Sequence, residues 1–193
     1  MEEQKNSESW LSNQKENIRT IIIAVILAIL LRTFVIEPRY IPSASMEPTL
    51  QIEDRIIVEK ITNFWRSPER GEILVFYPPA SPLIEDNFKA YIKRVIGLPG
   101  DLISIHDGQV FVNGQALTEP YIAESINYYL PDKPLESAIR VPANSYWMMG
   151  DNRNNSNDSH VWGFLPQQNI VGRAVLQFFP WDDRTGLIKT PSY

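Results

Sequence analysis

The chain has 193 residues, with 18 basic and 23 acidic side chains, a formal net charge of −5 and 44% hydrophobic residues. These values suit one folded domain and lack the basic stripe that nucleic-acid binding requires, so we expect no nucleic-acid partner. The absence of cysteine excludes disulfides, thiolate zinc sites and a cysteine nucleophile, and two histidines are too few for a His-rich metal centre. We therefore expect no metal and no cofactor, and catalysis that uses Ser, Thr, Lys, Asp, Glu or Tyr.

A hydrophobic segment follows a polar N-terminal tail. Residues 1–17 are polar, and we expect them to be disordered on the cytoplasmic side of a membrane. Every residue from Ile21 to Leu31 is apolar, and the stretch covers residues 18–36 if Arg19 and Arg32 are tolerated near its ends. A helix of this length spans about 28 Å, close to the ~30 Å hydrocarbon core, and arginines near its ends can reach the headgroups. The sequence therefore predicts one transmembrane helix over residues 18–36.

Two alternatives to a membrane anchor are a cleaved signal peptide and a buried helix of a soluble core. A signal peptide is cut at a small-x-small site shortly after its apolar core, and residues 32–40 contain no such triplet. The basic residues near the apolar segment are Lys5, Lys15 and Arg19 before it and Arg32 and Arg39 after it. This weak bias favours a cytoplasmic N-terminus and an extracytoplasmic or lumenal domain over residues 37–193.

Beyond Pro38, short β-prone runs alternate with Pro and Gly, which is typical of an all-β fold with mostly antiparallel sheets. The expected strands cover residues 55–61, 73–77, 90–96, 102–106, 110–112, 146–149 and 170–179. Asp107-Gly108 and Asn113-Gly114 flank one of these runs and predict two tight hairpin turns. Residues 124–140 show no periodicity, and we expect a loose connection there.

Two serines lie between prolines directly after the predicted helix, in the segment Ile41-Pro42-Ser43-Ala44-Ser45-Met46-Glu47-Pro48. Proline fixes φ and disfavours the helical conformation in the residue before it, so the segment is held extended. Taken alone, it fits a Ser-rich linker leaving the membrane better than it fits a site.

Two cations interrupt the apolar run Tyr91-Ile92-Lys93-Arg94-Val95-Ile96. Side chains alternate in a strand, so Lys93 and Arg94 lie on opposite faces, each among apolar neighbours. A lysine at its ordinary pKa is almost fully protonated at pH 7, and it acts as a base only where burial or nearby cations lower that pKa. Lys93 is therefore a candidate base if its face is buried, and the alternative is an edge-strand lysine that points to solvent.

A polar loop, Gly150-Asp151-Asn152-Arg153-Asn154-Asn155-Ser156-Asn157-Asp158-Ser159-His160, follows an apolar strand. It fails the calcium-loop template, because Ser156 occupies the sixth position instead of Gly and Trp162 the twelfth instead of Glu. Short polar side chains of this kind bond to the backbone and orient neighbouring groups. We therefore expect the loop to support a site.

Together, these segments resemble the type I (leader) signal peptidase family, in the form of its cyanobacterial and plastid branch. The similarity is carried by Glu37-Pro38, Pro42–Met46, Pro48-Thr49-Leu50, Arg70-Gly71-Glu72-Ile73, Lys93-Arg94, Gly97-Leu98-Pro99-Gly100-Asp101 and Gly150–Ser159. The resemblance implies a membrane-anchored serine endopeptidase that removes signal peptides from exported preproteins by a Ser-Lys dyad. It also implies Ala-x-Ala-type cleavage sites, contact with the lipid bilayer, and a single-pass location in a plasma or thylakoid membrane.

The resemblance also assigns roles to residues of this chain. It makes Ser45 the nucleophile, Lys93 the general base, Ser43 a hydrogen-bond donor to the oxyanion, and Ser156 the group that orients Lys93. The substrate-binding residues it implies are Ile41, Pro42, Met46, Leu50, Tyr91 and Ile92. The supporting motif it implies comprises Arg94, Gly150, Asp151, Asn152, Arg153, Asp158 and Ser159.

Two positions depart from the commonest pattern of the family. Asn154 stands where many members have Asp, and His160 stands where many have Arg. We expect Asp158 to pair with His160 in a pH-dependent way, or with Arg94 or Arg153 instead. Catalysis should survive either change.

Two other functions remain open at this point. One is a Ser-His-Asp hydrolase built from Ser45, His160 and Asp158, although Ser45 lacks the Gly-x-Ser-x-Gly elbow of α/β-hydrolases. The other is a membrane-anchored β domain that binds peptides without cutting them, which would be indifferent to the loss of Lys93.

The aromatic segments 64–65 and 178–181 either pack in the core, which we favour, or rest on the bilayer. The oligomeric state does not follow from the sequence.

Overall fold

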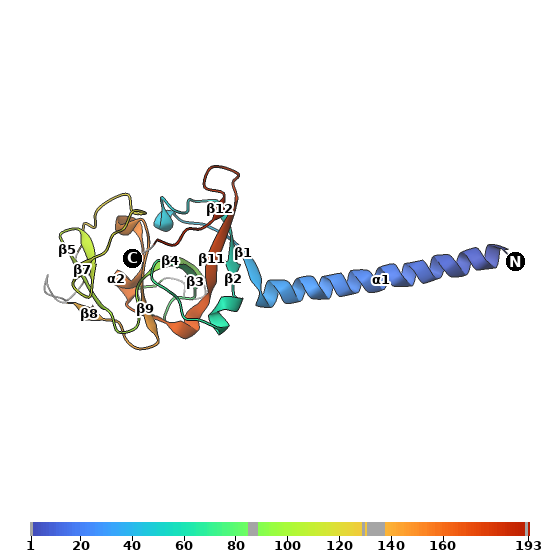
Figure 1. The fold of residues 1–193 in the computed structure, drawn as a ribbon, viewed down its shortest axis with the longest axis horizontal. Coiled ribbons are helices and arrows are strands. Elements are labelled where there is room, and N and C mark those ends of the chain that lie inside the picture. Colours follow the sequence, from blue (N-terminus) through green and yellow to red (C-terminus); the bar gives the residue numbers. More distant parts are fainter. Residues whose placement is uncertain (1, 85–88, 129, 131–137, 192) are drawn as a thin grey trace.

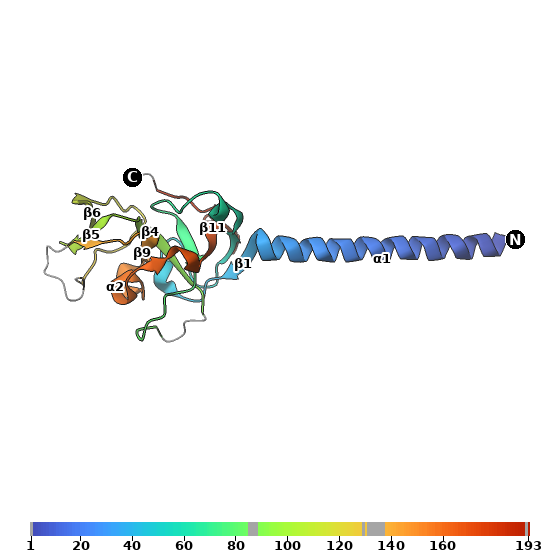
Figure 2. The ribbon, with the colours of Figure 1, turned by 90° about the horizontal axis from the view of Figure 1, so that it is seen from below.

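A long N-terminal helix and a β domain make up the structure, a computed structural model that describes residues 2–84, 89–128, 130, 138–191 and 193. The helix, α1 (Glu2–Phe34), projects away from the β domain, and the N-terminus lies at its far end (Figure 1). Figure 2 shows the same separation after a quarter turn. The expected fold class, mostly antiparallel β-structure with one N-terminal apolar helix, is confirmed.

Helix α1 differs in its bounds from the predicted span. Residues 2–17, for which the sequence predicts disorder, continue the helix, because Glu, Gln and Lys are good helix formers and extend a helix already formed in the apolar segment. The helix ends at Phe34, before the chain pairs as a strand. Within the described chain, Gln14–Phe34 is long and apolar enough to cross a membrane, with mean hydropathy 2.0.

The larger sheet has eight strands in the described part of the chain, in the order β1-β2-β11-β3-β4-β9-β10, with β12 paired to β11. The strands are β1 (Ile36–Tyr40), β2 (Arg55–Glu59), β3 (Ile73–Phe76), β4 (Tyr91–Gly97), β9 (Ser145–Met149), β10 (Leu165–Pro166), β11 (Ile170–Phe179) and β12 (Gly186–Leu187). All their pairings are antiparallel. Strand β4 lies between β3 and β9, so both its edges are bonded.

The smaller sheet has four strands in the order β7-β6-β5-β8. They are β5 (Leu102–His106), β6 (Gln109–Val112), β7 (Gln115–Ala116) and β8 (Ile139–Arg140). Asp107-Gly108 and Asn113-Gly114 form the two-residue turns between β5, β6 and β7, and all four residues have positive φ, as type I′ turns require. Both predicted hairpins are confirmed.

Short helical turns connect the strands: η1 (Ala44–Met46), η2 (Ile61–Phe64), η3 (Arg153–Asn155), α2 (Ser159–Trp162) and η4 (Gln167–Asn169). Each of the seven predicted strands is present, with ends shifted by at most two residues. The sequence missed β1, β7, β8, β10 and β12, four of which have only two residues. The predicted loose connection over residues 124–140 lies partly outside the described residues, and its last two residues form β8.

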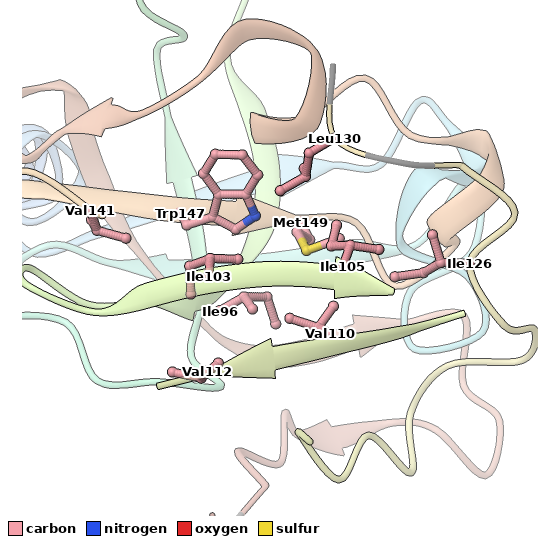
Figure 3. Close-up of a cluster of buried hydrophobic side chains, with 10 residues drawn as sticks. All are labelled: Ile96, Ile103, Ile105, Val110, Val112, Ile126, Leu130, Val141, Trp147 and Met149. Carbon is pink, nitrogen blue, oxygen red and sulfur yellow. The ribbon is translucent and has the colours of Figure 1, made fainter. Parts of the chain in front are cut away.

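A buried hydrophobic cluster joins the two sheets (Figure 3). Ile96 of β4 and Trp147 and Met149 of β9 pack with Ile103 and Ile105 of β5. The hairpin β5–β6 adds Val110 and Val112 to the same cluster. The C-terminal end of β4, which carries Ile96, is therefore packed in the same core that holds the smaller sheet in place.

We expect Ile103→Ala to destabilise the β domain by about 2–5 kcal/mol, because Ile103 is fully buried and its loss leaves a cavity between the sheets. Leu187→Ala is the matched control, since Leu187 is exposed and its truncation should cost less than about 0.5 kcal/mol. Urea denaturation of the detergent-solubilised protein, followed by tryptophan fluorescence, measures both values. Equal stability of the two variants would contradict this account of the core.

Candidate active site

Ser45 lies on η1, a single helical turn in the segment that joins β1 to β2. Asn152 holds this turn from the opposite side: its backbone N–H donates to the Ser45 carbonyl and its side-chain amide donates to the Ala44 carbonyl, both at 3.2 Å. The side chain of Ser45 is almost fully buried. The position of the Ser45 hydroxyl is thus set by contacts from a loop more than a hundred residues away in the chain.

Lys93 comes from β4 and meets Ser45 directly. Its Nζ lies 2.8 Å from Ser45 Oγ and donates a hydrogen bond to it, and a second bond of 2.9 Å goes to the Ile92 carbonyl. Nζ also lies 5.5 Å from the centre of the Tyr91 ring. Lys93 is 4% exposed, and Arg94 on the opposite face is 1% exposed. Both faces of β4 are therefore covered, and the alternative of a lysine that points to solvent is wrong.

The environment of Lys93 favours its neutral form. Burial lowers the pKa of Lys93 to about 8, against the raising effect of the Asp158 and Asp151 carboxylates. A buried amine of lowered pKa in hydrogen-bond contact with a hydroxyl is the arrangement by which a base activates a serine nucleophile. The site can therefore support acyl transfer through Ser45.

The Ser45–Lys93 pair opens into a cavity of about 580 Å³. Of the predicted substrate-binding residues, Ile41, Pro42, Tyr91 and Ile92 line this cavity. Met46 and Leu50 do not: both are fully buried in a core cluster beneath η1, where their side chains pack against the sheet. They share this cluster with the cavity-lining Ile41 and Ile92, and their part in substrate binding stays a prediction.

The cavity is also lined by residues that the sequence did not mark as substrate-binding, among them Arg39, Tyr40, Ile56, Val75, Lys89, Ala90, Asn155 and Asn157. Val75 reaches the cavity because it is the cross-strand partner of Ile92. Such pairings depend on the register between β3 and β4, which the sequence does not state. The sequence of β3 by itself shows only that Val75 is an apolar residue of a strand, not which residue of β4 lies beside it.

The two other predicted serines differ in their contacts. Ser43 lines the cavity, and its Oγ lies 3.4 Å from Ser45 Oγ. Ser156 Oγ is buried and has no hydrogen-bond partner among the described residues, so no bond joins it to Lys93, and its role in orienting Lys93 stays a prediction. Ser156 instead packs so closely on Gly150 that a Cβ at residue 150 would overlap both Ser156 Oγ and the Ser45 carbonyl oxygen. The Ile92 carbonyl bonds Lys93 Nζ in its place.

Arg94 pairs with Asp151, not with Asp158. Its Nε donates to Asp151 Oδ1 at 2.8 Å and its Nη2 to Oδ2 at 2.6 Å, which makes a forked ion pair between two buried groups. Its Nη1 donates to the Gly71 carbonyl at 2.7 Å, and the Thr49 hydroxyl donates to Asp151 Oδ2 at 2.5 Å. The first loop carboxylate is thus fully occupied by Arg94 and Thr49.

Asp158 binds within its own loop. It accepts the backbone N–H of Gly150 at 2.8 Å and contacts His160 Nδ1 at 2.7 Å, so the expected Asp158–His160 contact is present. Arg153, the other predicted partner of Asp158, binds the Gly150 carbonyl at 3.0 Å and a carboxylate outside the loop. The Ser159 hydroxyl accepts the N–H of Met148, within β9, at 2.8 Å. All the predicted motif residues therefore lie in one network beneath Ser45 and Lys93.

The alternative Ser-His-Asp arrangement finds no support in the contacts of His160. Among the described residues, the hydrogen bonds of its ring go to Asp158, and the ring stacks on Tyr128 at 4.1 Å between centroids. His160 does not line the cavity that holds Ser45. No group of three or more His, Asp or Glu side chains in the described chain is arranged to hold a metal ion.

Comparison with known proteins agrees with this geometry. Residues 14–181 match the family model "Signal peptidase, peptidase S26". The chain is 53% identical to "Probable signal peptidase I-1" of Synechocystis sp., over 86% of this chain and 83% of that protein. It is 50% identical to "Signal peptidase I" of Leptolyngbya laminosa, over 92% of this chain and 86% of that protein.

A plant protein extends the comparison to the plastid branch. The chain is 37% identical to "Thylakoidal processing peptidase 1, chloroplastic" of Arabidopsis thaliana, over 88% of this chain and 50% of that protein. The resemblance to the cyanobacterial and plastid branch is thereby confirmed. The chain belongs to the signal peptidase family, peptidase S26.

Proposed function

We propose that this signal peptidase removes signal peptides from exported preproteins with Ser45 as nucleophile and Lys93 as general base. The observation that carries the assignment is the 2.8 Å contact between Lys93 Nζ and Ser45 Oγ, made by two buried groups at the wall of a cavity. Burial keeps water from the amine and lowers its pKa, which makes proton transfer from the hydroxyl possible near neutral pH.

The reaction follows from these positions. Neutral Lys93 takes the proton of Ser45 while Oγ bonds to the carbonyl carbon of the scissile peptide, and Lys93 then gives that proton to the leaving amine as the C–N bond breaks. Water hydrolyses the Ser45 ester, with Lys93 again the base. Ser43 Oγ, on the cavity wall, and the Ser45 N–H are the proposed donors to the oxyanion.

The cavity wall suits a substrate with small side chains. Ile41, Val75 and Ile92 supply an apolar surface around the Ser45–Lys93 pair, and Tyr91 limits the space beside it. An extended segment of the Ala-x-Ala type would place two small residues against this wall. We therefore propose such segments as the cleavage sites.

The bilayer is the second proposed partner. Helix α1 would cross a plasma or thylakoid membrane with the N-terminus in the cytoplasm, as its flanking basic residues favour. Phe64, Trp65 and Trp181 are largely exposed, so the expectation that these aromatic residues pack in the core is wrong. Lys60, just before η2, donates to the Thr33 carbonyl of α1 at 3.3 Å, so the turn that carries Phe64, with Trp65 directly after it, starts beside the end of the helix. There they can rest on the membrane surface.

Ser45→Ala and Lys93→Met should each lower cleavage of an Ala-x-Ala preprotein by at least about 10³-fold, because each removes one member of the dyad. His160→Ala should retain most of the activity. Initial cleavage rates in detergent, with folding checked by circular dichroism, measure all three variants. Normal cleavage by Lys93→Met together with an inactive His160→Ala would replace the dyad with the histidine mechanism, and a folded wild type that never cuts would favour a peptide-binding domain.

The pH profile of kcat/KM should rise with an apparent pKa of about 8, because the neutral amine of Lys93 is the active form and its pKa lies near 8. Below this value the rate should fall about tenfold per pH unit, since protonated lysine cannot accept the serine proton. Initial rates between pH 5.5 and about 9.5 in one mixed buffer of constant ionic strength test this expectation. A flat profile across that range would remove Lys93 as the base.

The fragment 37–193 should bind zwitterionic liposomes without detergent, and Trp65→Ser together with Trp181→Ser should weaken binding by about tenfold or more. The reason is that each substitution removes an exposed aromatic surface which can bury itself at the headgroup level. Liposome sedimentation measures the bound fraction, with Tyr77→Ser, another exposed aromatic residue, as the control. Equal binding by all variants would contradict a role of Trp65 and Trp181 in membrane binding.

A further inference from the structure

The buried charges beneath the catalytic loop require a partner that the known motifs do not provide. Arg94 and Arg153 are both almost fully buried. Asp151 neutralises Arg94. The carboxylate that neutralises Arg153 belongs to Glu119, which follows β7 in the smaller sheet: Arg153 Nη1 lies 2.7 Å from Glu119 Oε2, and Nη2 makes a second bond to Oε1. Nothing in the sequence pattern pointed to Glu119.

Tyr121 holds Glu119 in this position. Its hydroxyl donates to Glu119 Oε1 at 2.7 Å and lies 2.7 Å from the hydroxyl of Tyr193. The face of its ring covers the Arg94 guanidinium at 4.0 Å from the ring centre, and the Arg153 guanidinium lies 6.0 Å from that centre. Tyr121 therefore contacts Arg94 through its ring, lies near Arg153, and bonds the carboxylate partner of Arg153.

Without Glu119, Arg153 would be an unpaired buried cation. Burial by itself lowers the pKa of Arg153, and the Glu119 carboxylate, with smaller effects from Tyr121 and Asp151, offsets this so that the pKa is raised. A buried charge left without its partner is strongly unfavourable, so the structure around it rearranges toward another counter-charge. Asp151 also acts electrostatically on Arg153. An unpaired Arg153 would therefore compete with Arg94 for Asp151. That competition would weaken the pairing of Asp151 with Arg94.

The consequence reaches Ser45 and Lys93 through the loop. Asn152, next to Asp151, bonds the Ser45 and Ala44 carbonyls, so a shift of the loop displaces the nucleophile. The charged groups acting on Lys93 from this loop are Asp151 and Asp158, while Arg94 adjoins it on β4. A rearranged Arg153 would change the field that these groups create at the amine.

We propose that Glu119, held by Tyr121, is a positioning residue for the Ser45–Lys93 dyad: it takes Arg153 as its partner and thereby leaves Asp151 to Arg94. The inference rests on the proposed function, because it concerns the placement of that dyad. It adds the segment that follows β7 to the loop and strand that hold Ser45 and Lys93.

The test compares variants whose charges differ in a known way. Glu119→Gln keeps the shape of the side chain and removes one negative charge, so kcat for the Ala-x-Ala preprotein should fall about 10- to 100-fold with KM unchanged. The added net positive charge disfavours protonated Lys93, so the acid limb of the pH profile should move to lower pH. The double variant Glu119→Gln/Arg153→Met restores the net charge, and its acid limb should return to that of the wild type.

Two further variants complete the design. Tyr121→Phe keeps the ring on Arg94 and removes only the hydroxyl bonded to Glu119, so kcat should fall by a smaller factor with no movement of the acid limb. Asp107→Asn is the matched control, because Asp107 is an exposed carboxylate on the β5–β6 turn and asparagine tolerates its positive φ. This control should leave kcat and the acid limb unchanged.

The outcomes separate this inference from the proposed dyad. If Lys93→Met is inactive while Glu119→Gln has the kcat and acid limb of the wild type, the positioning role is wrong and the dyad stands. If Glu119→Gln loses activity only in proportion to its folded fraction, with an unmoved acid limb, Glu119 is merely structural and the inference is overturned. If Glu119→Gln does not fold, a wild-type kcat for Tyr121→Phe overturns it instead. If Lys93→Met still cuts, both proposals fall.

Discussion

Burial of the Lys93 amine is the constraint on which the rest of the site depends. An amine can act as a base near neutral pH only if water is kept away from it, and a buried amine needs polar partners that do not restore its charge. Strand β4 meets the first condition because β3 and β9 bond to both its edges and side chains cover both its faces. Ser45 Oγ and the Ile92 carbonyl meet the second condition, since both are uncharged.

Much of the fold could be predicted because its signals are local. Type I′ turns need positive φ in adjacent residues, so Asp107-Gly108 and Asn113-Gly114 identify their hairpins without any tertiary information. Strands β10 and β12 have two residues each and form only because β9 and β11 are beside them. Likewise β1 contains Pro38 and two charged residues, and its pairing with β2 makes it a strand.

The residues of the candidate site likewise fall into those with a local sequence signal and those placed by tertiary packing. Ser45 and Lys93 could be named because each stands in a short segment with a recognisable order of residue types. Met46 and Leu50 stand in the same segment as Ser45, yet their side chains point into the core, and sequence proximity could not reveal this. The Arg153–Glu119 pair joins residues 34 positions apart in different parts of the fold. Choosing among the acids that could neutralise Arg153 requires knowing where the segment after β7 lies in the fold.

The two adjacent cations of β4 explain why the site draws on the segment that follows β7. Lys93 and Arg94 point to opposite faces of β4, and both are buried because both faces are covered. Lys93 can lose its proton, but arginine cannot, and Arg94 therefore needs a permanent counter-charge. Asp151 provides it from the loop that also positions Ser45 through Asn152. The other carboxylate of that loop, Asp158, is engaged by the Gly150 N–H and by His160, so Arg153 takes its counter-charge from outside the loop, from Glu119.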